Sequence, residues 1–166
     1  LALAALLAVP ACSKPFTLVS NAPARIVSAA SEASVPPSLR SEDALKHLKP
    51  DFTRLTTLSA QLGAAGYFVF TLATTGGNHL TESRMFCPAL GIAEDPVSGN
   101  AHGLLGVYLA QHGFLARNEP RVSFSGVQGQ QLHRPGRVNV ELEIKDGTID
   151  GVWIIGQAIS IFETEI

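Results

Sequence analysis

The stretch Glu94-Asp-Pro-Val-Ser-Gly-Asn-Ala-His-Gly103 places a carboxylate and a proline directly before the start of a helical pattern. Apolar residues recur at helical spacing through residues 98–112, and Gly113 then supplies a stop signal. The first turn of a helix has backbone N–H groups without intrahelical partners, at the positive end of the helix dipole. A junction of this kind can bind a small anion beside an acid, so the segment is a candidate functional site.

The helix predicted over residues 98–112 has small or apolar residues on both of its faces. We therefore expect it to be buried, and the interruptions at Gly103 and Gly106 indicate close packing against strands. The chain as a whole runs in the order strands, helices, strands, this helix and then a β-hairpin. We predict an α+β fold in which a strongly curved, mostly antiparallel sheet surrounds one central helix.

The hairpin is the clearest β pattern in the sequence. From Val138 to Lys145 apolar and polar residues alternate, which is typical of a half-buried strand. Asp146-Gly147 is a strong two-residue turn signal, and residues 148–162 are predicted to return as the partner strand.

Shorter elements are predicted ahead of the motif from turn and cap residues. Ser41 is expected to cap a short helix, with Glu42 and Asp43 in its first turn. Pro50-Asp51 opens a second predicted helix, which ends at Gly63. The other predicted elements are strands at residues 16–20, 25–29, 67–73 and 80–86 and a loop at residues 30–40.

With 166 residues the chain has the size of one domain, or of one half of a two-lobed protein. Its net charge of −2 and pI near 6.2 give no electrostatic reason to expect nucleic acid or an anionic membrane as a partner. Cys12 and Cys87 form no C-x-x-C pair, which argues against a zinc site or a disulfide framework and fits a reducing, cytoplasmic compartment. We expect a buried, inert thiol at Cys87 rather than a reactive one.

The apolar run from Leu1 to Cys12 could be the end of a secretory or lipoprotein signal, with Cys12 as the lipidated residue. It has no basic flank and is too short to span a bilayer. We therefore interpret residues 1–9 as the tail of a helix that starts upstream, and residues 1–15 as a remnant of that helix or a linker.

The histidines do not predict a metal site. His102 lies one turn into the predicted helix among apolar neighbours, where a core histidine is more common than a catalytic base. The remaining histidines lack the spacing of metal ligands. They are His47, His79, His112 and His133.

Residues 84–103, which read Arg84-Met-Phe-Cys-Pro-Ala-Leu-Gly-Ile-Ala-Glu-Asp-Pro-Val-Ser-Gly-Asn-Ala-His-Gly103, closely resemble the PhzF-like family of phenazine-biosynthesis isomerases and their relatives. Weaker similarity extends this over nearly the whole chain, at residues 50–55, 66–70, 126–129, 134–137 and 155–162. Family members have two similar lobes, each a strongly bent sheet around a central helix, with the active site between them. The resemblance implies that residues 16–166 form the C-terminal lobe, with a diaminopimelate-epimerase-like architecture.

The same resemblance implies a cofactor-independent isomerase that moves a proton between carbon atoms of a small carboxylate substrate. Asp95 would give charge and hydrogen-bond support, while Gly99 and Asn100 would bind the substrate through backbone N–H groups, with the Asn100 side chain as a further donor. The general acid/base glutamate of the family belongs to the first lobe and has no counterpart in this chain. The implied partners are a small carboxylate, the missing N-terminal lobe and a second copy in a homodimer, with no cofactor and no metal. We expect Asp95 within a residue or two of the helix start, outside any buried ion pair.

For Glu94 we favour a structural role, in which it faces solvent or pairs with Arg84. Two plainer interpretations of the chain stay open. In the first, Asp95-Pro96 only starts a turn and Asn100 only caps a helix. Against it stands Gly99, because a residue without a side chain lets a ligand carboxylate approach its N–H group closely. In the second, the chain is a non-catalytic module that binds small anions or takes part in assembly, since it lacks the catalytic glutamate.

Overall fold

The computed structural model describes residues 4–10, 41–72, 74–75 and 77–157. Four predicted segments lie outside these residues: the strands at 16–20 and 25–29, the loop at 30–40, and the last part of the returning strand at 158–162. The described residues form one mixed sheet and three α-helices.

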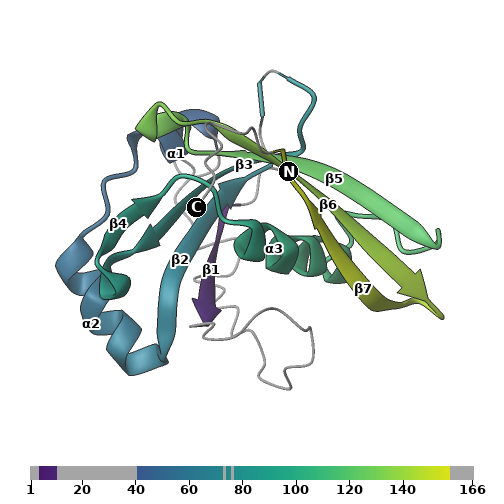
Figure 1. Cartoon of the computed structure of the whole chain (residues 1–166), viewed down its shortest axis with the longest axis horizontal. Coiled ribbons are helices and arrows are strands. Elements are labelled where there is room, and N and C mark those ends of the chain that lie inside the picture. Colours follow the sequence, from purple (N-terminus) through teal and green to yellow (C-terminus); the bar gives the residue numbers. More distant parts are fainter. Residues whose placement is uncertain (1–3, 11–40, 73, 76, 158–166) are drawn as a thin grey trace, which may run out of the picture.

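One seven-stranded sheet organises this part of the chain (Figure 1). Its strand order is β1-β2-β3-β5-β6-β7, and β4 pairs with β3 off this path. Every pairing is antiparallel except that of β3 with β5, so the predicted, mostly antiparallel sheet is confirmed. The strands are β1 Ala4–Pro10, β2 Ala64–Thr71, β3 Thr81–Cys87, β4 Ile92–Asp95, β5 Arg121–Gln128, β6 Gly136–Lys145 and β7 Thr148–Ile155.

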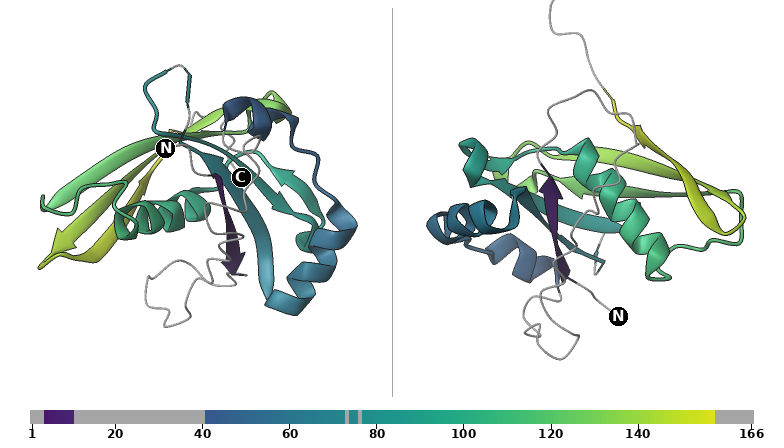
Figure 2. Two further views of the ribbon diagram at one scale, coloured as in Figure 1. Left: turned by 180° about the vertical axis from the view of Figure 1, so that it is seen from behind. Right: turned by 90° about the horizontal axis from the view of Figure 1, so that it is seen from below.

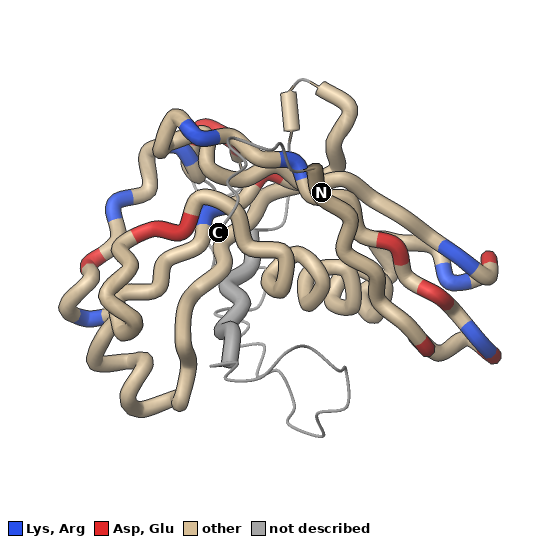
Figure 3. The backbone as a smooth tube through the Cα atoms, viewed as in Figure 1, with Lys and Arg blue, Asp and Glu red and all other residues tan. Residues whose placement is uncertain are grey.

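The sheet curls strongly into a half-barrel, and the helix α3 (Gly99–Gln111) lies along its concave side (Figures 1 and 2). This is the buried central helix predicted over residues 98–112, with Ser98 as its N-cap. No residue of α3 is charged, whereas Lys, Arg, Asp and Glu lie on the surrounding strands, loops and short helices (Figure 3). The helix can therefore enter the apolar interior of the sheet without burying a charge.

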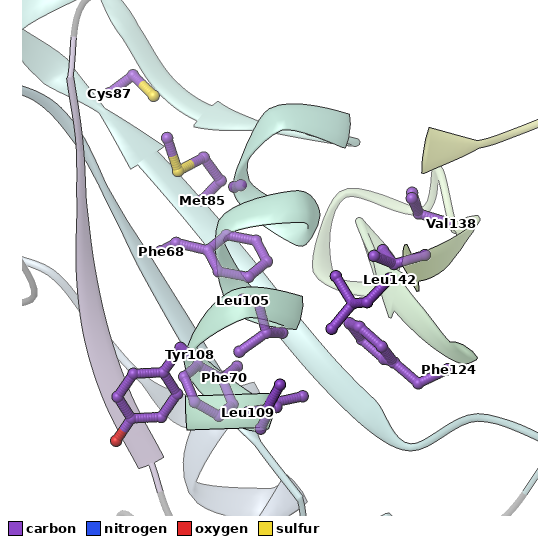
Figure 4. Packing of buried hydrophobic residues seen from close by; sticks show 13 residues of the cluster. Phe68, Phe70, Met85, Cys87, Leu105, Tyr108, Leu109, Phe124, Val138 and Leu142 are labelled. Carbon is purple, nitrogen blue, oxygen red and sulfur yellow. The ribbon is translucent and has the colours of Figure 1, made fainter. Parts of the chain in front are cut away.

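Side chains from both arms of the curved sheet meet on α3 (Figure 4). Phe68 and Phe70 of β2 and Phe124 of β5 form this core together with Leu105 and Leu109 of the helix. The glycines of α3 bring its backbone close to the strands, as predicted. A β-carbon added at Gly106 would lie 3.0 Å from Val140, 3.2 Å from Phe124 and 3.3 Å from Leu142.

Strand β1 corrects the expected helix tail. The prediction of helix over residues 1–9 is wrong for the described part, because Ala4–Pro10 is a strand that pairs antiparallel with β2. A short run of Leu and Ala has no period that separates a buried helix from a buried strand. Pairing with the edge of β2, which β3 leaves free, decides between them. The boundary at residue 15 stays a prediction.

Both N-terminal helices begin where the sequence predicts, and the second also ends at its predicted stop. In α1 (Glu42–His47) the Ser41 hydroxyl accepts a hydrogen bond from the Ala44 N–H at 3.1 Å. In α2 (Phe52–Leu62) the Asp51 carboxylate accepts one from the Arg54 N–H at 3.0 Å, and Gly63 ends the helix in the left-handed conformation. Both helices pack against β2, and α1 also contacts β3.

The predicted hairpin is confirmed: β6 and β7 pair from Lys145↔Thr148 to Asn139↔Ile155, with a register shift between Glu143 and Ile144. Strand β7 ends at Ile155, so the predicted strand over residues 148–162 is wrong at residues 156–157. Strands β4 and β5 were not predicted. They share one edge of β3, because β2 occupies the other: β5 pairs with Thr81–Ser83 and β4 with residues 85–87. The sheet thus splits at Arg84, and the connection from β4 to α3 leaves from this split. No helix among the described residues is long and apolar enough to cross a membrane.

Candidate functional site

The motif lies where β4 and β5 diverge along the edge of β3. Asp95 is the last residue of β4 and pairs with Met85. Pro96 and Val97 then lead to the N-cap Ser98, so Asp95 lies slightly farther from the helix start than the predicted one or two residues. The segment between them is anchored at both ends, because β4 pairs with β3 and α3 packs in the core.

The first turn of α3 presents unbonded donors. The Ser98 side chain makes no capping hydrogen bond, although its residue type is a good N-cap. Within the described residues the N–H groups of Gly99 and Asn100 have no hydrogen-bond partner. Gly99 is half-buried and Asn100 is exposed. Asn100 lies inside the helix and is not its cap, so the interpretation of Asn100 as a helix cap is wrong.

Asp95 is a half-buried carboxylate without an ion pair among the described residues. Burial raises its pKa, while the backbone N–H of Val97 and the positive charge of Arg134 act in the opposite direction. The influence of the Val97 N–H on this carboxylate fits a turn that begins at Asp95. That turn leaves further lone pairs of the carboxylate available to a ligand.

A buried glutamine holds this segment from the β5 side. Gln128 is 1% exposed; its Nε2 donates to the Asp95 carbonyl oxygen at 2.6 Å and its Oε1 accepts from the Ser98 N–H at 3.1 Å. The next residue, Gly129, has φ +85°, and an added β-carbon there would lie 2.5 Å from the Pro96 carbonyl oxygen. Only glycine therefore lets the turn after β5 approach the motif this closely.

Glu94 has the structural role that was predicted. The guanidinium of Arg84 donates to both of its carboxylate oxygens, at 2.9 and 2.7 Å, and both side chains are about nine-tenths buried. Arg84 also donates to the carbonyl oxygens of Leu45 and Leu48 at the end of α1, at 3.0 and 2.8 Å. This network joins α1 to β3 and β4.

His102 is a core residue, as expected, and is fully buried. Its Nδ1 lies 2.8 Å from the Ser98 carbonyl oxygen, and its ring packs edge-on against Phe68 with 5.1 Å between the centroids. Burial lowers the pKa of His102. The predicted inert thiol is also present: Cys87 is 5% exposed, and burial raises its pKa to about 11, with the charge of Asp95 as a smaller cause.

Sequence reasoning missed two residues of the site. Gln128 carries no local signal, since its partners lie 30 and 33 residues away in the sequence. Arg134, which was not predicted as a site residue, contributes positive charge near Asp95. Among the described residues no group of three or more His, Cys, Asp or Glu side chains could hold a metal ion.

Comparisons with known proteins give the chain its relatives. A family model described as phenazine biosynthesis-like protein, PhzC-PhzF, matches residues 13–164. A protein named uncharacterized isomerase YddE from Salmonella typhimurium is 37% identical over 148 residues, which are 89% of this chain and 49% of that protein. Trans-2,3-dihydro-3-hydroxyanthranilate isomerase from Pseudomonas fluorescens is 30% identical over 122 residues, 74% of this chain and 40% of that protein.

A crystal structure of a Bacillus anthracis phenazine biosynthesis protein of the PhzF family has the same fold, with a TM-score of 0.55 at 23% identity. The match covers 68% of this chain and 42% of that one. The chain thus spans about half the length, or less, of the curated relatives it matches. Because the family model matches most of its length, the chain belongs to the phenazine biosynthesis-like, PhzC-PhzF, protein family.

Proposed function

We propose that this chain is the C-terminal lobe of an isomerase that moves a proton between two carbon atoms of a small cyclic carboxylic acid. The proposal gives the lobe a diaminopimelate-epimerase-like architecture, with the active site facing a second lobe. A glutamate outside this chain takes the proton from one carbon and returns it to another, so no cofactor is needed. Curated relatives carrying the name isomerase support the reaction class.

The observation that carries the proposal is the pair of unbonded N–H groups at the start of α3, next to Asp95. Backbone N–H groups at the positive end of a helix dipole bind a carboxylate well. Gly99 has no side chain to keep the ligand away, and the exposed Asn100 amide offers another donor. In this arrangement the substrate carboxylate binds to the helix start.

Asp95 then supports the reacting part of the substrate. Its carboxylate accepts hydrogen bonds from hydroxyl or amino groups beside the reacting carbon. A carboxylate whose pKa is raised by burial is a stronger acceptor than one in water. Arg134 adds positive charge that favours an anionic substrate and the charge that develops as the proton leaves the carbon.

The surroundings suit a ring. Val97 and Ile154 are 40% and 38% exposed, and the Ile154 side chain lies 3.2 Å from the place a β-carbon of Gly99 would occupy. An apolar ring can pack on these side chains while its carboxylate binds to the N–H groups. Trans-2,3-dihydro-3-hydroxyanthranilate, named in one relative, has this combination of ring and carboxylate.

Titration of the ¹⁵N-labelled chain with benzoate tests the binding half of the proposal by NMR. Benzamide is the control, since it has the same shape without the charge. Benzoate should shift the amide resonances of Gly99 and Asn100 with a dissociation constant on the order of millimolar, and benzamide should shift them far less. Equal shifts with both compounds, or benzoate shifts confined to other regions, would refute a carboxylate site at the start of α3.

A further inference from the structure

Two buried polar side chains hold the segment from Asp95 to Ser98 from beneath. Gln128 is 1% exposed and His102 is not exposed at all. Neither reaches the surface where a substrate would bind, so neither can contact it directly. Their hydrogen bonds nevertheless end on the backbone groups that flank the candidate site.

Gln128 fixes both ends of the segment with one side-chain amide. The Nε2 group donates to the Asp95 carbonyl at 2.6 Å, and Oε1 accepts from the Ser98 N–H at 3.1 Å. The amide thereby sets the distance between the strand that carries Asp95 and the helix start that carries the free N–H groups. Because β5 pairs with β3 on one side and β6 on the other, Gln128 itself is rigidly placed.

His102 fixes the helix start from its other side. A carbonyl oxygen only accepts hydrogen bonds, so the contact of 2.8 Å with the Ser98 oxygen requires the proton on Nδ1. The same oxygen accepts from the His102 backbone N–H at 3.2 Å. In the neutral ring Nε2 then carries no proton. This nitrogen and Thr81 Oγ1 both lie beside Gly126, because a β-carbon added there would be 2.8 Å from Nε2 and 2.7 Å from Oγ1.

We infer that Gln128 and His102 are positioning residues for the anion site, which they hold in its binding geometry before a ligand arrives. The inference rests on the proposed function, because it assumes that Gly99 and Asn100 bind a carboxylate. A preset site loses less conformational entropy on binding, and errors of about 1 Å in its geometry cost up to 10²-fold in function. The two side chains act through Ser98 and Asp95, so their loss weakens binding without removing a ligand contact.

The test uses the same benzoate titration on variants of the full chain. Gln128→Met keeps the length of the side chain and removes both hydrogen bonds, and Gln131→Met is the matched control in the adjoining turn. His102→Leu removes the bond to Ser98, whereas His102→Asn keeps a donor near the position of Nδ1. We expect Gln128→Met and His102→Leu to weaken benzoate binding about tenfold, and His102→Asn and Gln131→Met by less than about threefold.

A second readout needs no ligand. In ¹⁵N spectra of the unsubstituted chain, His102 should show a protonated Nδ1 and an unprotonated Nε2. The opposite tautomer would overturn the role of His102, and unchanged benzoate binding by folded Gln128→Met would overturn that of Gln128. If Gln128→Met fails to fold, Gln128→Asn, whose shorter amide cannot span both partners, takes its place with the same expectation. Failure of benzoate to bind the unsubstituted chain would instead refute the proposed function.

Discussion

Successive side chains of a strand point to opposite faces, and this separates Glu94 from its neighbour Asp95. Glu94 points to the outer face, where Arg84 binds both of its oxygens. Asp95 points to the inner face, where it is half-buried and close enough to Cys87 to influence the thiol. One carboxylate therefore fastens the strand, while the other stays available to a ligand.

Cys87 gives a prediction at the scale of one residue. Because burial raises the pKa of its thiol to about 11, almost none of it is thiolate at pH 7.5. Iodoacetamide should alkylate Cys87 in the native chain at least about 100-fold more slowly than it alkylates free glutathione. Peptide mass spectrometry separates Cys87 from Cys12, and the same reaction in urea is the control. A rate close to that of glutathione in the folded protein would contradict the burial of this thiol.

At the scale of one element, α3 depends on glycines to approach the sheet. The three apolar side chains of Val140, Phe124 and Leu142 surround Gly106 at 3.0 to 3.3 Å. At Gly103 the nearest atom is the end of the Ile154 side chain, 2.7 Å away, and that residue is 38% exposed. The side chains around Gly106 are therefore held in place, whereas the Ile154 side chain beside Gly103 can rearrange.

The two glycines should therefore respond differently to alanine. Gly106→Ala should lower the free energy of unfolding by about 1–2 kcal/mol, since overpacking exceeds the gain in helix propensity of about 1 kcal/mol. Gly103→Ala should change it by less than about 1 kcal/mol, because Ile154 can rotate away. Urea denaturation of both variants measures the difference. A Gly106→Ala variant that is more stable than the unsubstituted chain would contradict the packing described for α3.

The start of α1 gives a prediction about pH. Hydrogen bonds from Lys46 and Thr75 lower the pKa of Glu42 from 4.5 to about 2. A lowered pKa in the folded state adds stability above pH 4.5, and this stability is lost as the pH falls towards 2. Glu42→Gln should thus lower the free energy of unfolding by about 1–2 kcal/mol at pH 7, and the difference should shrink below pH 4.5. Asp43→Asn, in the same turn, is the control. Urea denaturation from pH 3 to 7 measures the free energies of unfolding. A loss of stability in Glu42→Gln that did not depend on pH would contradict this account.

At the scale of the whole molecule, the sequence predicts features that depend on local patterns, but not those that depend on long-range contacts. The burial of α3, the caps Ser41 and Asp51 and the hairpin at Asp146-Gly147 follow from short-range rules, and the structure confirms them. The strand at Ala4–Pro10 does not, because only its pairing with β2 separates it from a helix.

The candidate site divides in the same way. Asp95, Gly99 and Asn100 could be named from one motif, since adjacent residues build most of that surface. Gln128 could not be named in this way. It contacts the motif only because β4 and β5 pair with successive parts of the same edge of β3. Its place depends on the topology of the entire sheet.

The measurement that tests the central claim most directly is deuterium incorporation from D₂O into a small cyclic carboxylic acid that the two-lobed protein isomerises. The experiment uses a two-lobed protein, in which this chain follows an N-terminal lobe of the length found in its relatives. The Asp95→Asn variant of that protein is compared with the unsubstituted form. We predict exchange by the two-lobed protein, a rate about 10²-fold or more lower for Asp95→Asn, and melting temperatures that agree within a few degrees. Unchanged exchange together with a large loss of thermal stability would contradict the account, because Asp95 would then be only a turn residue.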